Sequence, residues 1–170
     1  MDRDASFREF VLRRGPALSR VAYLLTGDHQ LAEDLLQTAL ARSVPRWSRL
    51  VAAGDPEAYV RRIMVNERTT WWRRSRYERT GRVDVISDLT EGVAAGTDEA
   101  DQVALRASLL AALARLTPRQ RAVLVLRYFA DQSVEDTARA LGCSSGTVKS
   151  TTSDALSRLR DVTTDLWKVT

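Results

Sequence analysis

The sequence predicts an all-α protein of two small helical domains that are joined by a flexible acidic linker. Apolar residues recur at helical spacing through most of the 170 residues, and no segment alternates long enough to demand a strand. Residues 81–101 carry six acidic residues against one arginine, with three glycines and no helical apolar stripe. We therefore expect domains at residues 1–80 and 102–170, with a tether that lets both bind one partner at once.

Composition favours a folded protein, because 44% of the residues are hydrophobic and 28% are charged. The net charge of +4 is modest and by itself says little, but the sequence pI of about 9.7 leans towards a polyanionic partner. With one cysteine, Cys143, and one histidine, His29, neither an internal disulfide nor a Cys or His-pair metal site can form, and we predict no cofactor. No apolar run approaches the ~20 residues that span a bilayer, so a cytoplasmic protein without membrane insertion is expected.

The first 54 residues predict two helices and a loop. An apolar stripe runs from Phe7 to Leu25, and Gly15-Pro16 within it is expected to kink or restart the helix. Thr26-Gly27-Asp28 stops this helix and caps the next one, whose stripe ends at Pro45. Ser48 to Gly54 is predicted to be a loop.

A long arginine-rich helix should follow, starting at Asp55-Pro56 and running to about Arg79. From Tyr59 to Arg79 it holds seven arginines against two glutamates, and Trp71, Trp72 and Tyr77 lie among them. Arginines neutralise phosphates and aromatic rings stack on unpaired bases, which is typical of single-strand binding. The alternative is that the arginines form a solvated basic face and that tryptophan side chains are buried in the core. Trp71 is then the first candidate for burial.

The last third predicts a leucine-rich helix from Val103 to Leu116, followed by two capped helices. Thr117 with Gln120 is predicted to form a capping box, and Ser133 with Asp136 a second box of the same kind. Gly142 then supplies a left-handed turn, and Ser144 can cap the final helix.

Ser133 to Arg160 predicts a helix-turn-helix. Val148, Thr152, Ala155, Leu156 and Leu159 should face inward, and Cys143 is interpreted as a small filler rather than a redox sensor. Small polar side chains on the opposite face suit a helix in the DNA major groove; a purely structural helical corner would not need them. The predicted DNA-binding residues of this helix are Ser145, Thr147, Lys149, Ser150, Thr151, Ser153, Asp154 and Arg158.

The chain resembles the extracytoplasmic-function (ECF) sigma factors, which carry only regions 2 and 4 of the bacterial sigma family. The start of region 2 is similar to "LLTGDHQLAEDLLQTALARSVPRW", and its DNA-melting part to "AYVRRIMVNERTTWWRRSR". Region 4 is similar to "LTPRQRAVLVLRYFADQSVEDTARALGCSSGTVKS", which output domains of other regulators partly share.

The resemblance implies a protein that binds core RNA polymerase, at its clamp and flap, and recognises promoter −10 and −35 elements. It implies that the Ser48–Gly54 loop receives an everted −10 base. An anti-sigma factor is a further partner that it implies. The implied −10 contacts are Arg62, Asn66, Thr69, Trp72, Arg73 and Arg76. The implied polymerase surface holds Glu33, Asp34, Leu36, Gln37 and Arg42, with Trp47 nearby.

Two departures from the family pattern affect contacts rather than the fold. Arginines that are common in the recognition helix are replaced here by Thr151, Asp154 and Leu156, which should weaken or redistribute phosphate anchoring at −35. Asp154 could instead accept from a cytosine amino group. The usual Gln-Glu pair of the polymerase face is Gln37-Thr38 here.

Three functions remain to be weighed. A sigma factor would have no catalytic chemistry of its own. An autonomous regulator that binds an operator as a dimer would need a dimer interface and a ligand or phosphoacceptor domain, for which the N-terminal half shows no pattern. A recombinase or nuclease would need clustered carboxylates or a positioned nucleophile, and the acids that cluster here lie in the expected linker.

Overall fold

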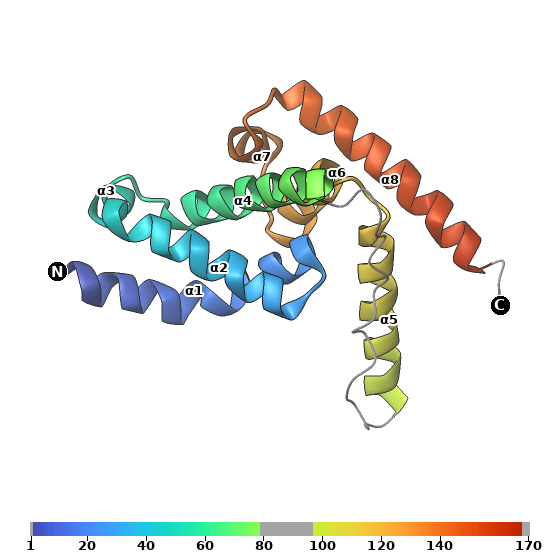
Figure 1. The fold of residues 1–170 in the computed structure, drawn as a ribbon, viewed down its shortest axis with the longest axis horizontal. Coiled ribbons are helices and arrows are strands. Elements are labelled where there is room, and N and C mark those ends of the chain that lie inside the picture. Colours follow the sequence, from blue (N-terminus) through green and yellow to red (C-terminus); the bar gives the residue numbers. More distant parts are fainter. Residues whose placement is uncertain (1, 79–96, 168–170) are drawn as a thin grey trace.

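The structure, a computed structural model, describes residues 2–78 and 97–167, with side chains for 2–71 and 101–161. Every regular element in these ranges is a helix, which confirms the all-α prediction (Figure 1). In chain order they are α1 (Arg3–Thr26), α2 (His29–Ser43), the 3-10 turn η1 (Val44–Arg46), α3 (Trp47–Ala52), α4 (Pro56–Glu78), α5 (Thr97–Ala114), α6 (Pro118–Leu124), the π-turn η2 (Val125–Phe129), α7 (Val134–Leu141) and α8 (Ser145–Trp167).

Helices α1, α2 and α4 pack around one core, in which Leu18, Leu35 and Met64 are fully buried. Their order follows from strong stop and start signals. Gly27 adopts a left-handed φ of 75° at the end of α1, and the Asp28 side chain accepts from the Leu31 amide to begin α2.

The expected restart at Gly15-Pro16 is absent, since α1 is one helix from Arg3 to Thr26 with Pro16 inside it. Proline removes the hydrogen bond to the carbonyl four residues earlier, here that of Leu12. Leu12 and Pro16 are both exposed, so water can satisfy that carbonyl and the proline ring meets no core residue. The exposed position explains why the helix tolerates this proline.

Ser48 to Gly54 is mostly helical rather than a loop. Helix α3 covers Trp47–Ala52, and Gly54 ends the turn with a φ of 85°. Trp47 at the start of α3 is only 2% exposed, so its burial draws this segment onto α1. The sequence did not predict helix α3 because one buried side chain, rather than a row of apolar residues at helical spacing, anchors it.

Helix α5 begins at Thr97, so residues 97–101 are helical where the linker was expected to continue. Asp98, Glu99 and Asp101 suggested a linker, yet acidic residues also favour the positive N-terminal end of a helix. Helix α5 points away from the body of the molecule (Figure 1), and Val103 and Leu105 on it are exposed. The rest of the expected linker, residues 81–96, lies outside the described ranges.

The second helical group contains the predicted helix-turn-helix. Thr117 and Gln120 form the full capping box of α6, with hydrogen bonds of 3.1 and 3.2 Å. Ser133 caps α7 through the Asp136 amide, but the Asp136 carboxylate accepts from the Ser133 hydroxyl instead of from a backbone amide. That hydroxyl bond, with a lesser contribution from Arg139, holds the pKa of Asp136 below its usual value.

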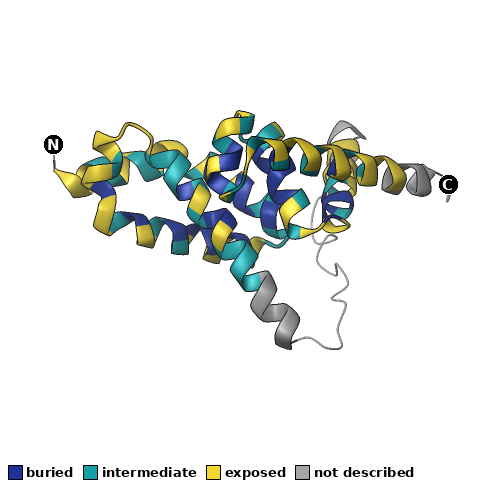
Figure 2. Cartoon of the chain, turned by 90° about the horizontal axis from the view of Figure 1, so that it is seen from above, coloured by how far each residue is buried: buried dark blue, intermediate teal, exposed yellow. Residues whose placement is uncertain are grey.

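The two helical groups pack against each other. Buried residues of α6, η2 and α7, namely Ala122, Val125, Leu126 and Ala140, belong to the same apolar cluster as the core of α1, α2 and α4. Figure 2 shows the resulting concentration of buried residues in the middle of the molecule. Residues of the two groups therefore share part of one apolar core in this structure.

Candidate DNA and polymerase interface

The N-terminal half of α8 presents a polar, exposed face. Gly142 makes the turn with a φ of 63°, and the Ser144 hydroxyl accepts from the Thr147 amide at 3.1 Å, which fixes the start of α8. The side chains along this face are small or flexible. Lys149, Ser150, Ser153, Asp154 and Arg158 are exposed, whereas Ser145, Thr147 and Thr151 are half-buried.

The opposite face of α8 holds the helix in place. Val148 and Ala155 are fully buried, and Thr152 donates its hydroxyl to the Val148 carbonyl at 2.7 Å. Val148 packs with Val123 and Ala138 in a small cluster, against which Cys143 is half-buried, as expected for a filler. The inward residues predicted from spacing are thus the ones that dock α8.

A second polar line runs along α4. Arg62, Asn66 and Thr69 are spaced four and three residues apart, which places them on one side of a helix. Arg62 and Asn66 are exposed, and the Thr69 hydroxyl donates to the Val65 carbonyl at 2.9 Å. Trp72, Arg73 and Arg76 continue α4 in sequence, but their side chains lie outside the described residues.

Other arginines of α4 have structural partners. Arg61 pairs with Glu57, which also reaches Arg14 at 3.3 Å. Arg68 donates to the Leu25 carbonyl at 3.2 Å, and the half-buried Trp71 packs on the first core, as the alternative interpretation of this helix predicted. On one side of α4, arginines therefore stabilise the fold through their partners. On the other side, Arg62 and Asn66 are exposed.

A hollow of about 350 Å³ lies beside Arg62. Its wall on the side of the first group includes Leu50 of α3, Asp55 and Tyr59. This wall includes part of segment 48–54, which the resemblance to the family predicts to receive an everted −10 base. The second group closes its other side with Gln132, Asp136, Arg139 and Ala140.

The candidate polymerase residues divide into exposed and buried ones. Glu33, Asp34, Gln37 and Arg42 are exposed on α2. The Gln37 amide donates to Glu33 at 3.1 Å, and Arg42 pairs with Glu67 of α4. Leu36, at 9% exposure, and Trp47 face inward, so in this structure they offer almost no surface to a partner.

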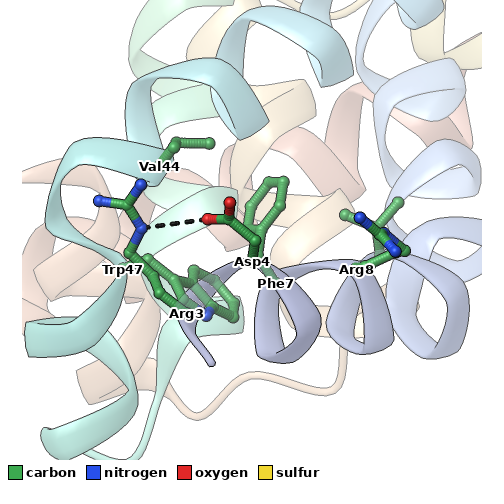
Figure 3. Close-up of a pocket in the computed structure, with 7 residues that line it drawn as sticks. Arg3, Asp4, Phe7, Arg8, Val44 and Trp47 are labelled. Atoms are coloured by element: carbon green, nitrogen blue, oxygen red, sulfur yellow. Dashed lines mark hydrogen bonds and ion pairs between the residues drawn. The ribbon is translucent and has the colours of Figure 1, made fainter. Parts of the chain in front are cut away.

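Trp47 instead joins α1 to α3. Its indole Nε1 donates to the Ser6 hydroxyl at 3.2 Å, and its ring lies 4.9 Å from those of both Phe7 and Phe10. One edge of the ring borders a hollow of about 390 Å³ at the start of α1 (Figure 3). Arg3 and Asp4 also line this hollow and form an ion pair of 3.3 Å (Figure 3).

Sequence reasoning missed two residues at these sites. Tyr59 lines the hollow beside Arg62 and accepts from Arg46 at 2.7 Å, although its spacing gave no signal. Arg121 is 7% exposed and donates to the Leu24 carbonyl of the first group. Nothing in "TPRQR" distinguishes the buried Arg121 from the exposed Arg119 beside it.

Comparison with known proteins gives independent information. Residues 10–77 match the family model for sigma-70 region 2, and residues 106–159 match that for sigma-70 region 4. The chain is 44% identical over 155 residues to the RNA polymerase sigma-E factor of Streptomyces coelicolor, covering 91% of this chain and 84% of the relative. It is 30% identical to the ECF sigma factor SigM of Mycobacterium tuberculosis, covering 91% and 75% of the two chains.

Two solved structures have a similar fold over most of this chain. The sigma factor RpoE, crystallised with the anti-sigma factor NepR from Bartonella quintana, superposes with a TM-score of 0.70 at 26% identity, covering 94% of this chain and 97% of that one. CnrH, solved with the cytosolic domain of CnrY, shares the fold with a TM-score of 0.63 at 19% identity, over 95% and 90% of the two chains.

The helix-turn-helix and the helical fold define a DNA-binding regulator of transcription. Within that class, the chain belongs to the ECF sigma factors of the sigma-70 family. This membership favours the sigma factor over the autonomous dimeric regulator. In the described part of the chain, no helix is long and apolar enough to cross a membrane.

Proposed function

We propose that the protein directs core RNA polymerase to promoters by holding duplex −35 DNA on α8 and a melted −10 strand on α4. The observation that carries this proposal is the pair of exposed polar faces on two different helices of one sigma-family chain. One face is the start of a recognition helix; the other is the line of Arg62, Asn66 and Thr69.

At −35, the small side chains of α8 let its N-terminal half lie deep in the major groove. Lys149 and Arg158 neutralise phosphates, while Ser150 and Ser153 hydrogen-bond to base edges or phosphates. Asp154 accepts from a cytosine amino group. The half-buried Ser145, Thr147 and Thr151 complete this surface and help to set how deeply α8 enters the major groove.

At −10, a single strand lies along α4. Asn66 offers both a donor and an acceptor to a base edge, and Arg62 neutralises a phosphate. Thr69, Trp72, Arg73 and Arg76 extend the contact, with Trp72 available for stacking. An everted base enters the hollow that Leu50, Asp55 and Tyr59 form beside Arg62.

Core polymerase binds α2 through Glu33, Asp34, Gln37 and Arg42. Leu36 and Trp47 contribute by positioning this surface rather than by direct contact, because both are buried. The flap of the polymerase binds the second helical group. The protein acts in the cytoplasm, performs no chemistry of its own, and an anti-sigma factor of the kind found with its structural relatives is a further partner.

The test is run-off transcription with purified core polymerase on genomic fragments. We expect Asn66→Ala to impair open-complex formation more than initial docking, because it removes a contact made only with the melted strand. Lys149→Ala should do the reverse, weakening docking and reducing the salt dependence of binding by about one phosphate contact. Both exposed residues lie outside the cores, so neither change should affect folding.

Permanganate footprinting of the −10 region measures opening, and filter binding at several salt concentrations measures docking. Unimpaired transcription by both variants would refute the two residue assignments. Failure of the unsubstituted protein to support promoter-dependent transcription would refute the function itself.

A further inference from the structure

The hollow of about 390 Å³ at the start of α1, called the α1 hollow below, lies outside the surfaces assigned to promoter DNA. Its walls are mainly apolar and are formed by Phe7 and Val11 of α1, Val44 of η1 and Trp47 of α3. Its volume lies within the range of about 300–1,000 Å³ that is usual for sites of small organic groups. The α1 hollow is therefore large enough to hold a flat ring system and apolar enough to desolvate it.

Cationic side chains lie at the rim of the α1 hollow. Residues of α1 that line it follow the i, i+3, i+4, i+7 spacing of one helix face, namely Asp4, Phe7, Arg8 and Val11. Arg3 is paired with Asp4 at 3.3 Å, whereas Arg8 is exposed and has no partner among the described residues. In Figure 3 the Phe7 ring lies between the guanidinium groups of Arg3 and Arg8. An unpaired cation beside an aromatic ring suits a nucleotide, whose base stacks and whose phosphate needs neutralising.

The α1 hollow is connected to the proposed −10 surface through another hollow. This middle hollow, of about 670 Å³, is lined by α1, α3 and the start of α4. It shares Trp47 with the α1 hollow and Asp55 with the hollow beside Arg62. The three hollows therefore follow one another around α3, and a single strand that leaves the hollow beside Arg62 can follow them to the start of α1.

Charge distinguishes the α1 hollow from the proposed polymerase surface on α2. Glu33 and Asp34 are exposed there and present negative charge, and Arg42 is already paired with Glu67. The α1 hollow instead has the unpaired charge of Arg8. Its occupant should thus combine a negative charge with an apolar or aromatic group, and DNA is the anionic partner that the proposed function already supplies.

We propose that the α1 hollow binds a second unpaired nucleotide of the promoter strand, further along the strand than the base that enters the hollow beside Arg62. The base of this nucleotide packs on Phe7 and Val11, and its phosphate is neutralised by Arg8. This inference rests on the proposed function and adds a second point of base capture to it. The melted strand is then held around α3 as well as along α4.

The test uses the complex of the protein with core polymerase, bound to a promoter with a duplex −35 element and an unpaired −10 strand. One abasic nucleotide at a time is placed along the unpaired strand, and the affinity for each promoter is measured. Two separate positions should each lower the affinity by about tenfold or more, as expected when a base stacked on a protein is removed. Val11→Trp fills the α1 hollow without changing its charge. It should abolish the loss at one of these positions and preserve the loss at the other.

Arg8→Ala tests the phosphate contact in the same complex. The slope of log affinity against log salt concentration should fall in magnitude by about 0.7, the value for one phosphate of a single strand. Arg20→Ala is the matched control, because Arg20 is an exposed arginine of the same helix that does not line the α1 hollow. It should leave the slope unchanged. Both variants should unfold at the same temperature as the unsubstituted protein, since both side chains are exposed.

Three results would overturn the second nucleotide site. One is a scan in which Val11→Trp abolishes the loss at no position, and another is equal slopes in Arg8→Ala and Arg20→Ala. The third is weaker binding of core polymerase without DNA by Val11→Trp or Arg8→Ala, because the hollow would then hold the polymerase. If Val11→Trp proves unstable, the slopes of the two arginine variants still decide.

The same scan separates this inference from the proposed function. If no abasic position lowers the affinity, strand capture by α4 fails together with the second site. If one position lowers the affinity and still does so in Val11→Trp, only the second site is refuted.

Discussion

Trp47→Ala should lower the free energy of unfolding by about 3–5 kcal/mol, the usual loss when a large buried aromatic side chain is truncated. Trp47 is 2% exposed, packs on Phe7 and Phe10, and is the buried anchor at the start of α3. Its loss should free α3 from α1 and disorder the wall of the hollow beside Arg62, and promoter opening should fail with it. Urea unfolding followed by circular dichroism measures the loss, because the substitution removes a fluorophore.

Two milder variants separate the contributions at Trp47. Ser6→Ala removes only the partner of the indole N–H and should cost about 1 kcal/mol. Trp47→Phe keeps most of the ring packing and should fall between Ser6→Ala and Trp47→Ala. If Trp47→Ala unfolded at the same urea concentration as the unsubstituted protein yet lost polymerase binding, Trp47 would be a contact residue rather than a structural one.

Val148→Asp should destabilise the helix-turn-helix by about 3–5 kcal/mol, because it places an unpaired carboxylate in a fully buried position. Val148 packs on Val123 and Ala138, which join α6 and α7 to α8. Loss of this cluster should undock the recognition helix and abolish −35 binding. Thermal unfolding and binding to a −35 duplex by the polymerase complex measure the two effects.

Lys149→Asp is the matched control for Val148→Asp, since it introduces the same side chain one residue later on the exposed face. It should change stability by no more than about 0.5 kcal/mol. It should nevertheless weaken −35 binding by at least about tenfold, because it replaces a phosphate-neutralising cation with an anion. Equal stability losses in the two variants would contradict the assigned orientation of α8.

The helix-turn-helix was predictable because its signals are local. Capping at Thr117 and Ser133, the left-handed Gly142 and the apolar spacing around Val148 each act within a few residues. They agree with one another, so a single sequence suffices to place the inward face of α8. Once the inward face of α8 is placed, the opposite, exposed face is placed as well. That exposed face carries the residues proposed to contact −35 DNA.

The parts that escaped prediction depend on contacts between distant residues. Pro16 is tolerated because its side of α1 faces solvent, and α3 forms because Trp47 reaches α1. Arg121 is buried against the first group, where it donates to the carbonyl of Leu24, 97 positions earlier in the chain. No local pattern reports such pairings, and the apolar contacts between the two groups are pairings of the same kind.

The central claim is that the chain holds paired DNA with α8 and an opened strand with α4. The most direct measurement compares the affinity of the polymerase complex for two promoters with the same duplex −35 element, one with a paired −10 element and one with an unpaired −10 strand. The unpaired −10 strand should bind more tightly, and Asn66→Ala should remove most of that difference while leaving −35 binding intact. Equal affinity for the two promoters, or an undiminished preference in Asn66→Ala, would contradict the role assigned to α4.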